Sequence, residues 1–362
     1  MKSIFKNRLQ LIMAVLAAVL LAVFGITTAG GNPGETTLRL NDLRARITGH
    51  NHDYRVMTLE VEETRDHLDE LDELLTELER GKEQAEALEV AGLEEVLSTI
   101  VRSFEEENKE ARKAVSRLEH EQEILAERLT RQAEKLYYTY FALRVEEKIQ
   151  QETLDYLREM FDMEKERRKQ GLITLQEIER AVLQVEQSQL ILEAVRDRQK
   201  DILNRLKLLA GYNLDLNLRL IEPALPEIEE LNLREAIDYA LNEGLTVKMR
   251  EKQYDLDPGE KERLKLEQAR REARLQVKES FRAVQQAEKQ YRLQERALNL
   301  AEIILERARA RHEAGLVSGL ELMKSYLELM EARQDYTQSG YDYSTALKDF
   351  KLARQGVIRP AD

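Results

Sequence analysis

The sequence lacks cysteine and tryptophan altogether, and it has only five prolines and fifteen glycines among its 362 residues. Without cysteine the chain has no disulfides, no thiol nucleophile, no thiolate metal site and no acceptor for a bacterial lipid anchor. Aromatic residues are scarce at 6%, whereas charged residues reach 35%. Long stretches of Ala, Glu, Lys, Leu, Arg and Gln at helical spacing are typical of coiled coils, which bury a narrow seam and not a thick core.

The chain also lacks the patterns on which most enzymes and nucleic-acid-binding proteins depend. Its net charge is −13, and after the N-terminus no block of lysine and arginine is present that could replace phosphate counterions. His50 and His52 lie close together without a third ligand at metal spacing, which favours a polar surface pair over a metal site. No phosphate-binding glycine loop and no Ser-His-Asp order is visible. We therefore expect no nucleic-acid binding, no catalysis, no cofactor and no metal.

The N-terminus has the layout of a secretory signal peptide. Basic residues within the first eight positions precede an uncharged apolar run over 11–26, and small residues follow at 27–29, where a signal peptidase reads. The alternative is an uncleaved membrane anchor, although the run is shorter than the roughly 20 residues of a spanning helix. In both cases the rest of the chain is expected to be exported to the cell envelope, in the periplasm or associated with the outer membrane.

An internal repeat is the most informative feature of the sequence. Residues 137–209 align without gaps on residues 281–353, at an offset of 144. At the centre of each copy a short motif reads as a tight helix–turn–helix tip. The residues of the two tips are Gly171, Leu172, Ile173 and Thr174 in the first copy, and Gly315, Leu316, Val317 and Ser318 in the second.

Local chemistry supports the turn in both copies. Gly171 and Gly315 can adopt the left-handed conformation that ends a helix, and basic residues before them complement the negative end of the helix dipole. The next helix then begins with a capping box, which pairs Thr174 with Glu177 in the first copy. Ser318 and Glu321 form the same pattern in the second copy.

The arms around the second tip carry a strict seven-residue apolar period. The large residues at this spacing are Val277, Val284, Tyr291, Leu298 and Leu305 before the tip, and Leu322, Leu329, Tyr336, Tyr343 and Phe350 after it. Such a period keeps one seam facing a partner helix when the pair supercoils with a left hand. The sequence thus predicts an all-α fold of two long antiparallel coiled-coil α-hairpins, in which these stripes form the core.

These signals divide the chain into six segments. They are a signal peptide or N-terminal membrane anchor (1–29), a first-half helical segment with extra helix (30–136), the first coiled-coil hairpin (137–211), a linker with a short extended segment and a helix (212–259), the second coiled-coil hairpin (260–356) and a tail (357–362). The extra helix is expected to be interrupted near Gly81 and Gly92, and the linker helix to run over 231–254.

The duplicated tip carries a family resemblance. The run from Arg311 to Ser318, followed by an acidic residue and a long Ala-rich helix, resembles the TolC-like family of outer-membrane efflux proteins, and the resemblance covers most of residues 137–356. It implies a homotrimer whose hairpins form a TolC-like α-tunnel across the periplasm. It also implies that the two tips contact the hairpin tips of a periplasmic adaptor, which works with an inner-membrane pump.

The resemblance implies an acidic constriction at the tunnel entrance, just past the tips. Glu321 matches the first acidic position of the family and Glu177 is its counterpart in the first copy, whereas Lys324 stands at the next acidic position. Because Glu321 also completes a capping box, a purely structural role remains open beside the constriction.

The chain departs from the family in one respect. Family members insert membrane-spanning β-hairpins between the helical arms, but no pair of strands of about 9–11 residues fits at 257–259 or in the acidic segment 60–110. Little or no β-structure is therefore expected. Two functions follow as alternatives: a TolC-like component of an efflux or secretion duct, or a non-conducting coiled-coil spacer or tether of the envelope.

Overall fold

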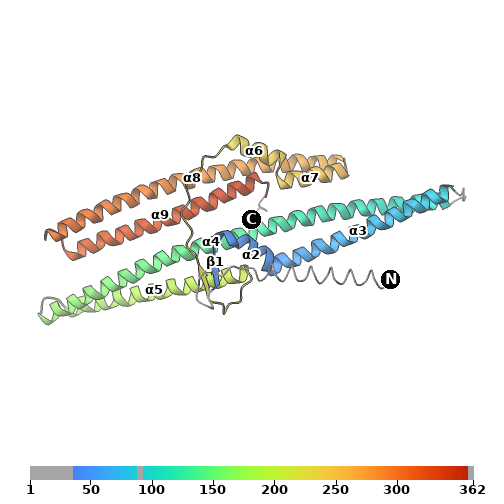
Figure 1. The fold of residues 1–362 in the computed structure, drawn as a ribbon. Coiled ribbons are helices and arrows are strands. Elements are labelled where there is room, and N and C mark those ends of the chain that lie inside the picture. The colour runs from blue at the N-terminus through green and yellow to red at the C-terminus, as the bar shows by residue number, and fades with distance from the viewer. Residues whose placement is uncertain (1–35, 88–92, 358–362) are drawn as a thin grey trace, which may run out of the picture.

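The computed structural model describes residues 36–87 and 93–357. Its elements are β1 (Thr36–Leu38), the 3₁₀ helix η1 (Leu40–Asp42), α2 (Leu43–His50), α3 (His52–Ala87), α4 (Leu93–Lys169), α5 (Leu175–Leu209), β2 (Leu218–Leu220), α6 (Leu233–Asn242), α7 (Leu245–Leu256), α8 (Glu260–Glu313) and α9 (Gly319–Arg354). The result is an elongated molecule of long paired helices (Figure 1). The predicted all-α class is confirmed, and the predicted signal or anchor at 1–29 lies outside the described residues.

Two hairpins extend toward one end of the molecule, α4 with α5 and α8 with α9 (Figure 1). Their seams are the predicted heptad positions. Val277, Val284 and Tyr343 are at most 1% exposed, and Leu305 and Phe350 are also buried. A sustained seven-residue period therefore accounts for the pairing of α8 with α9 along the 36 residues of α9, about 54 Å at 1.5 Å per residue.

The predicted extra helix is a third long hairpin, formed by α3 and the first part of α4, and it points away from the tips (Figure 1). Val61, Leu71, Val101 and Val115 form its buried seam. The predicted interruption near Gly81 is wrong, because α3 runs through this residue to Ala87. The predicted break near Gly92 lies outside the described residues.

The linker helix predicted over 231–254 is two helices, α6 and α7, which are separated at Gly244. The break is caused by a contact with the end of the chain. A Cβ on Gly356 would lie 2.7 Å from the Cα of Gly244, and the amide of Leu245 donates to the carbonyl of Gln355 at 2.9 Å. A continuous helix would have used that amide within itself, so the approach of a distant segment overrides the local pattern.

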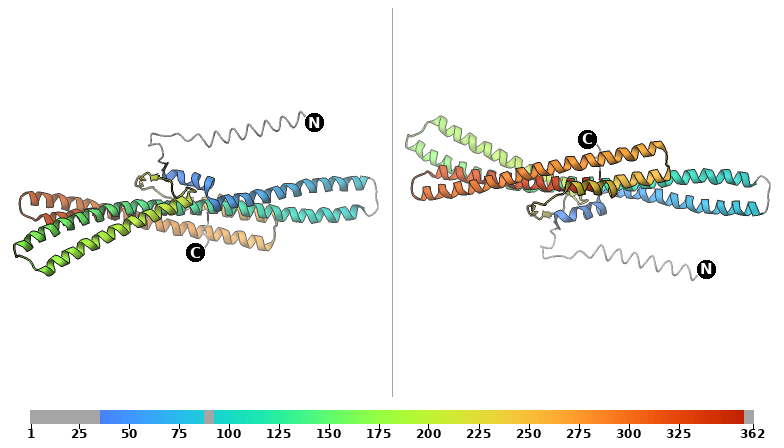
Figure 2. Two further views of the ribbon diagram at one scale, coloured as in Figure 1. Left: turned by 90° about the horizontal axis from the view of Figure 1, so that it is seen from below. Right: turned by 90° about the horizontal axis from the view of Figure 1, so that it is seen from above.

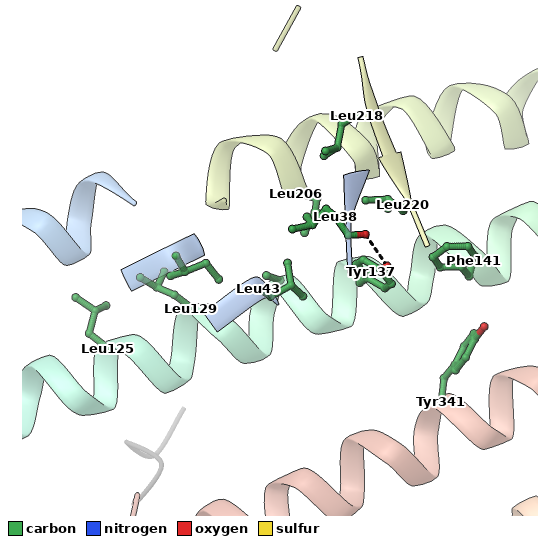
Figure 3. Packing of buried hydrophobic residues seen from close by; sticks show 12 residues of the cluster. Leu38, Leu43, Leu125, Leu129, Tyr137, Phe141, Leu206, Leu218, Leu220 and Tyr341 are labelled. Carbon is green, nitrogen blue, oxygen red and sulfur yellow. Dashed lines mark hydrogen bonds between the residues drawn. The ribbon is translucent and has the colours of Figure 1, made fainter. Parts of the chain in front are cut away.

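The centre of the molecule holds a small core around two parallel strands. β1 pairs with β2, and Leu38 lies opposite Leu220. The hydroxyl of the fully buried Tyr137 donates to the carbonyl of Leu38 at 3.0 Å and lies against the carbonyl of Ile221 (Figure 3). Burial raises the pKa of Tyr137 to about 12, so the phenol stays a neutral donor. This core fixes the N-terminal strand to the middle of α4.

The two halves of the chain meet along α4 and α9. Arg131 binds Asp349 at 2.6 Å, Glu134 binds Lys348, and the rings of Tyr138 and Tyr341 stack with centroids 4.8 Å apart. Since α4 also packs on α5, and α9 on α8, the four tip-side helices lie in the order α5, α4, α9, α8. Within residues 36–87 and 93–357, no helix combines the length and the apolarity that crossing a bilayer takes.

Candidate functional site

The two tips lie at the same end of the molecule, on separate hairpins (Figures 1 and 2). The arms that carry them have equal lengths, because Tyr137 and Phe281 are aligned in the repeat and each precedes its tip glycine by the same number of residues. The structure therefore presents two equivalent turns at one end of the four-helix layer.

Both tips end their first helix with the same backbone motif. Gly171 has a φ of 72° and Gly315 a φ of 73°. The amide of Gly171 donates to the carbonyl of Arg168 at 2.9 Å, and the next amide, of Leu172, donates to the carbonyl of Arg167 at 3.0 Å. The second tip repeats this pair of hydrogen bonds. The pattern is a Schellman motif, which satisfies helix-end carbonyls at a left-handed glycine.

Both tips also begin their second helix with the predicted capping box. Oγ1 of Thr174 accepts from the amide of Glu177, while Oε2 of Glu177 accepts from the amide of Thr174 at 2.6 Å. Ser318 and Glu321 form the same reciprocal pair. Hydrogen bonds from the Thr174 backbone and side chain lower the pKa of Glu177, so this carboxylate keeps its charge while it caps the helix.

A further pair of tip residues was not predicted. Nη1 of Arg168 donates to the carbonyl of Ile173 at 2.9 Å, and Nδ1 of His312 lies 3.0 Å from the carbonyl of Val317. The two residues are equivalent in the repeat, and each closes its turn from the preceding helix. The signal was present in the sequence as a basic residue three positions before each tip glycine.

The tips expose apolar side chains. Leu172 is 63% exposed and Leu316 is 71% exposed, whereas Ile173 and Val317 turn partly inward. Glu177 and Glu321 are exposed on the first turn of the returning helices. Each tip therefore exposes a leucine and a carboxylate on a turn that local hydrogen bonds close.

The two outer helices of the layer expose apolar residues along their arms. On α5, Leu183 and Leu190 are 56% and 65% exposed, and on α8, Leu293 and Leu300 are 57% and 59% exposed. Each pair is seven residues apart, which is the spacing of a coiled-coil seam. Within a single chain these rows face solvent, although their period is that of a surface that packs against another helix.

Among the described residues, no group of three or more His, Asp or Glu side chains is arranged to hold a metal ion.

Residues 253–353, which span α8 and most of α9, match the family of outer membrane efflux proteins. No curated relative is similar enough in sequence to count as a match.

Solved structures resemble the chain over most of its length. The Campylobacter jejuni CmeC outer membrane channel is 11% identical with a TM-score of 0.66, and the match covers 89% of this chain and 87% of that protein. The Vibrio cholerae outer membrane protein VceC is 11% identical with a TM-score of 0.58, covering 87% and 96%. The Neisseria gonorrhoeae MtrE outer membrane channel is 13% identical with a TM-score of 0.57, covering 89% and 90%.

At such low identity these structures show the fold alone, and the family match extends over the second hairpin. Both are matches to channel and efflux proteins and not to enzymes, in agreement with the expectation of no catalytic site. The chain thus has the fold of these outer-membrane channels, and its residues 253–353 match the outer membrane efflux protein family.

Proposed function

We propose that the protein is a component of an envelope efflux or secretion duct, which contacts a periplasmic adaptor through its two hairpin tips. The observation that carries this proposal is the matched pair of tips. Two turns with the same Schellman motif, the same capping box and an exposed leucine stand at the end of arms of equal length. A tether does not need matched tips. A ring of repeated contacts with a partner, in contrast, needs all of its tips to lie at the same distance along the molecule.

The exposed rows on α5 and α8 support assembly into a closed ring. They lie on opposite edges of the four-helix layer, so the edge of one copy would pack against the other edge of the next. Such heterologous contacts close into rings when the rotation between copies permits. A homotrimer would bring twelve tip-side helices into one tunnel wall, with an inner-membrane pump as the partner of the adaptor.

Glu177 and Glu321 are candidates for a charged constriction at the tunnel entrance. Both lie one turn past a tip and are exposed. Since capping uses the ionised carboxylate, the structural role and a ring of negative charge at the entrance are compatible.

The second candidate function is the non-conducting spacer or tether. One observation favours it: the hairpin of α3 and α4 adds a long rod on the side opposite to the tips (Figure 1). A tether predicts monomers or dimers and no dependence on the tips.

Sedimentation with small-angle scattering on the chain from Asn32 to Asp362 separates the two functions. A hollow trimeric rod is expected for the duct. Leu190→Glu and Leu300→Glu should each dissociate it, because a carboxylate enters an apolar seam, while Leu316→Glu should leave it intact. An elongated monomer or dimer that ignores all three substitutions would establish the tether.

Contact through the tips can be tested in cells with a photo-crosslinking residue at position 316. A crosslinked product with a periplasmic adaptor is expected, and Leu264, which is 54% exposed on α8, is the matched control position. A trimer that crosslinks equally from both positions would retain the duct and reject adaptor contact through the tips.

A further inference from the structure

A large groove lies about 60 Å from the tips, where the two halves of the chain meet. Its volume is about 1400 Å³, and its lining comes from α3, α4, α8, α9 and the start of α7. Pockets for small ligands usually measure about 300–1,000 Å³, so this groove has room for a peptide segment. It is separate from the tips and from the exposed Leu183, Leu190, Leu293 and Leu300.

Two walls of the groove carry the same pattern. On α3, Asp53 and Glu60 flank Val56, and on α8, Glu272 and Glu279 flank Leu275. In both helices the acidic residues are seven apart and the apolar residue stands three positions after the first of them. Val56 is 43% exposed and Leu275 is 56% exposed, so the apolar side chains remain open to an occupant.

The groove is strongly acidic. Seven carboxylates line it against two arginines, and one of these, Arg131, already binds Asp349 at 2.6 Å. His120 also lines the groove, and burial and Arg250 lower its pKa, so it adds little positive charge at neutral pH. An occupant with positive charge would reduce the repulsion among these groups.

We propose that this groove docks an amphipathic helix of a partner protein, with an apolar seam flanked on both sides by lysine or arginine. Carboxylates seven residues apart are separated by about 10.5 Å along a helix, which is the repeat of flanking charges in a coiled coil. An apolar anchor between each pair matches the way in which amphipathic helices enter grooves. This contact goes beyond the duct function, because it needs neither the tips nor the exposed rows of α5 and α8.

A designed peptide tests the proposal on the chain from Asn32 to Asp362. The probe is a 21-residue helix with leucine at the seam positions and lysine at the flanking positions, and the matched control peptide carries glutamate at the flanks. Fluorescence anisotropy should show binding of the lysine peptide alone. The affinity should fall with salt, because exposed charge pairs are screened.

The walls are then tested one at a time. Asp53→Asn with Glu60→Gln, and separately Glu272→Gln with Glu279→Gln, should each weaken binding about fivefold, since each double substitution removes two exposed charge contacts of modest strength. Leu275→Gln should also weaken binding. The matched control is Glu186→Gln with Asp201→Asn, two exposed carboxylates of α5 outside the groove.

Four results would overturn the proposal. One is equal binding of both peptides, and another is an equal loss of affinity in the control variant. The third is displacement of a second copy of the chain when the peptide binds, which sedimentation would detect and which would assign the groove to self-assembly. If dodecyltrimethylammonium binds and the peptide does not, the groove accepts small cationic amphiphiles and no helix.

Discussion

The two tip-side hairpins are aligned residue for residue, yet they fill the middle of their seams in different ways. In the second hairpin, Tyr291 and Tyr343 stack with centroids 6.1 Å apart, and Tyr343 is fully buried. At the equivalent places in the first hairpin stand Glu147 and Gln199, which are joined by a 2.9 Å hydrogen bond. The same backbone plan therefore accepts an aromatic layer in one copy and a polar layer in the other.

The opposite ends of the two halves differ more. α3 has 36 residues and α7 has 12, while α4 has 77 residues and α8 has 54, so the first half is longer by 24 and 23 residues in its two arms. This adds about 35 Å to the rod. Residues 60–110 also carry 19 acidic and 5 basic residues, a net charge of −14, against −13 for the whole chain.

The two halves of the chain share their geometry on the tip side and not on the opposite side. Lengths and turn chemistry agree on the tip side, while length and charge diverge on the other side. Seam composition differs even where the lengths agree, so what the halves share is the position of the tips and not the content of the core. A function at the tips explains this pattern directly.

Loss of the aromatic layer should have the largest effect. We expect Tyr343→Ala to lower the free energy of unfolding by about 3–5 kcal/mol, because it leaves a cavity in a closed seam. The equivalent Gln199→Ala removes hydrogen bonds only and should cost about 1 kcal/mol. Urea unfolding followed by circular dichroism at fixed protein concentration measures both. Similar costs for the two substitutions would show that the layers are energetically equivalent.

The two helices of the long hairpin are joined by a polar link through a buried asparagine, whereas α7 and α8 of the short hairpin are joined by the ion pair of Glu251 and Arg270. Nδ2 of the buried Asn108 donates to Asp72 at 2.7 Å, and Arg112 binds both residues. Asn108→Ala should cost about 1–3 kcal/mol, since it removes the hydrogen bonds that a buried amide makes to Asp72 and Arg112. Hydrogen exchange should accelerate in α3 and stay unchanged at the tips. Asn299→Ala, at an exposed position of α8, is the control, and uniform acceleration along the chain would contradict a local role.

The two tip glycines should respond alike. A left-handed conformation costs a residue with a Cβ about 1–2 kcal/mol, so Gly171→Ala and Gly315→Ala should lower the free energy of unfolding by that amount each. No neighbouring atom lies within 4 Å of the added Cβ at either tip, so steric clashes give no reason for the two substitutions to differ in cost. Gly81→Ala, inside helix α3, should instead stabilise the protein by about 0.5–1 kcal/mol. Unequal losses of unfolding free energy at the two tips would show that the tips are not equivalent.

One titratable histidine lies where the two halves of the chain meet. His120 of α4 lies 3.3 Å from Oγ1 of Thr246 at the start of α7, and burial, together with Arg250, lowers its pKa. Below about pH 6.5 the unfolded chain takes up this proton more readily, so the free energy of unfolding should fall on acidification. His120→Gln should reduce the difference between pH 7.5 and pH 5.5, and His67→Gln, at an exposed position of α3, should not.

Local chemistry explains what the sequence could predict. The tip glycines, the capping boxes and the heptad seams each depend on residues close together in the chain, and the structure confirms all three. Gly244 shows the limit, because its break depends on Gly356, more than a hundred residues away. The docking role of the tips stays a prediction, since exposure of Leu172 and Leu316 identifies a surface and not its partner.

The smallest effect should come from exchanging the residues that close the two turns. Arg168 and His312 occupy the same place, and each lies against the carbonyl before the helix N-cap. His312→Arg should change the free energy of unfolding by at most about 0.3 kcal/mol, whereas His312→Ala should cost about 0.5 kcal/mol, the low end for an exposed hydrogen bond. Thermal unfolding of the two variants beside Arg168→His measures the exchange in both directions. If either exchange cost more than its alanine substitution, each turn would require its own residue, and the tips would be alike in backbone alone.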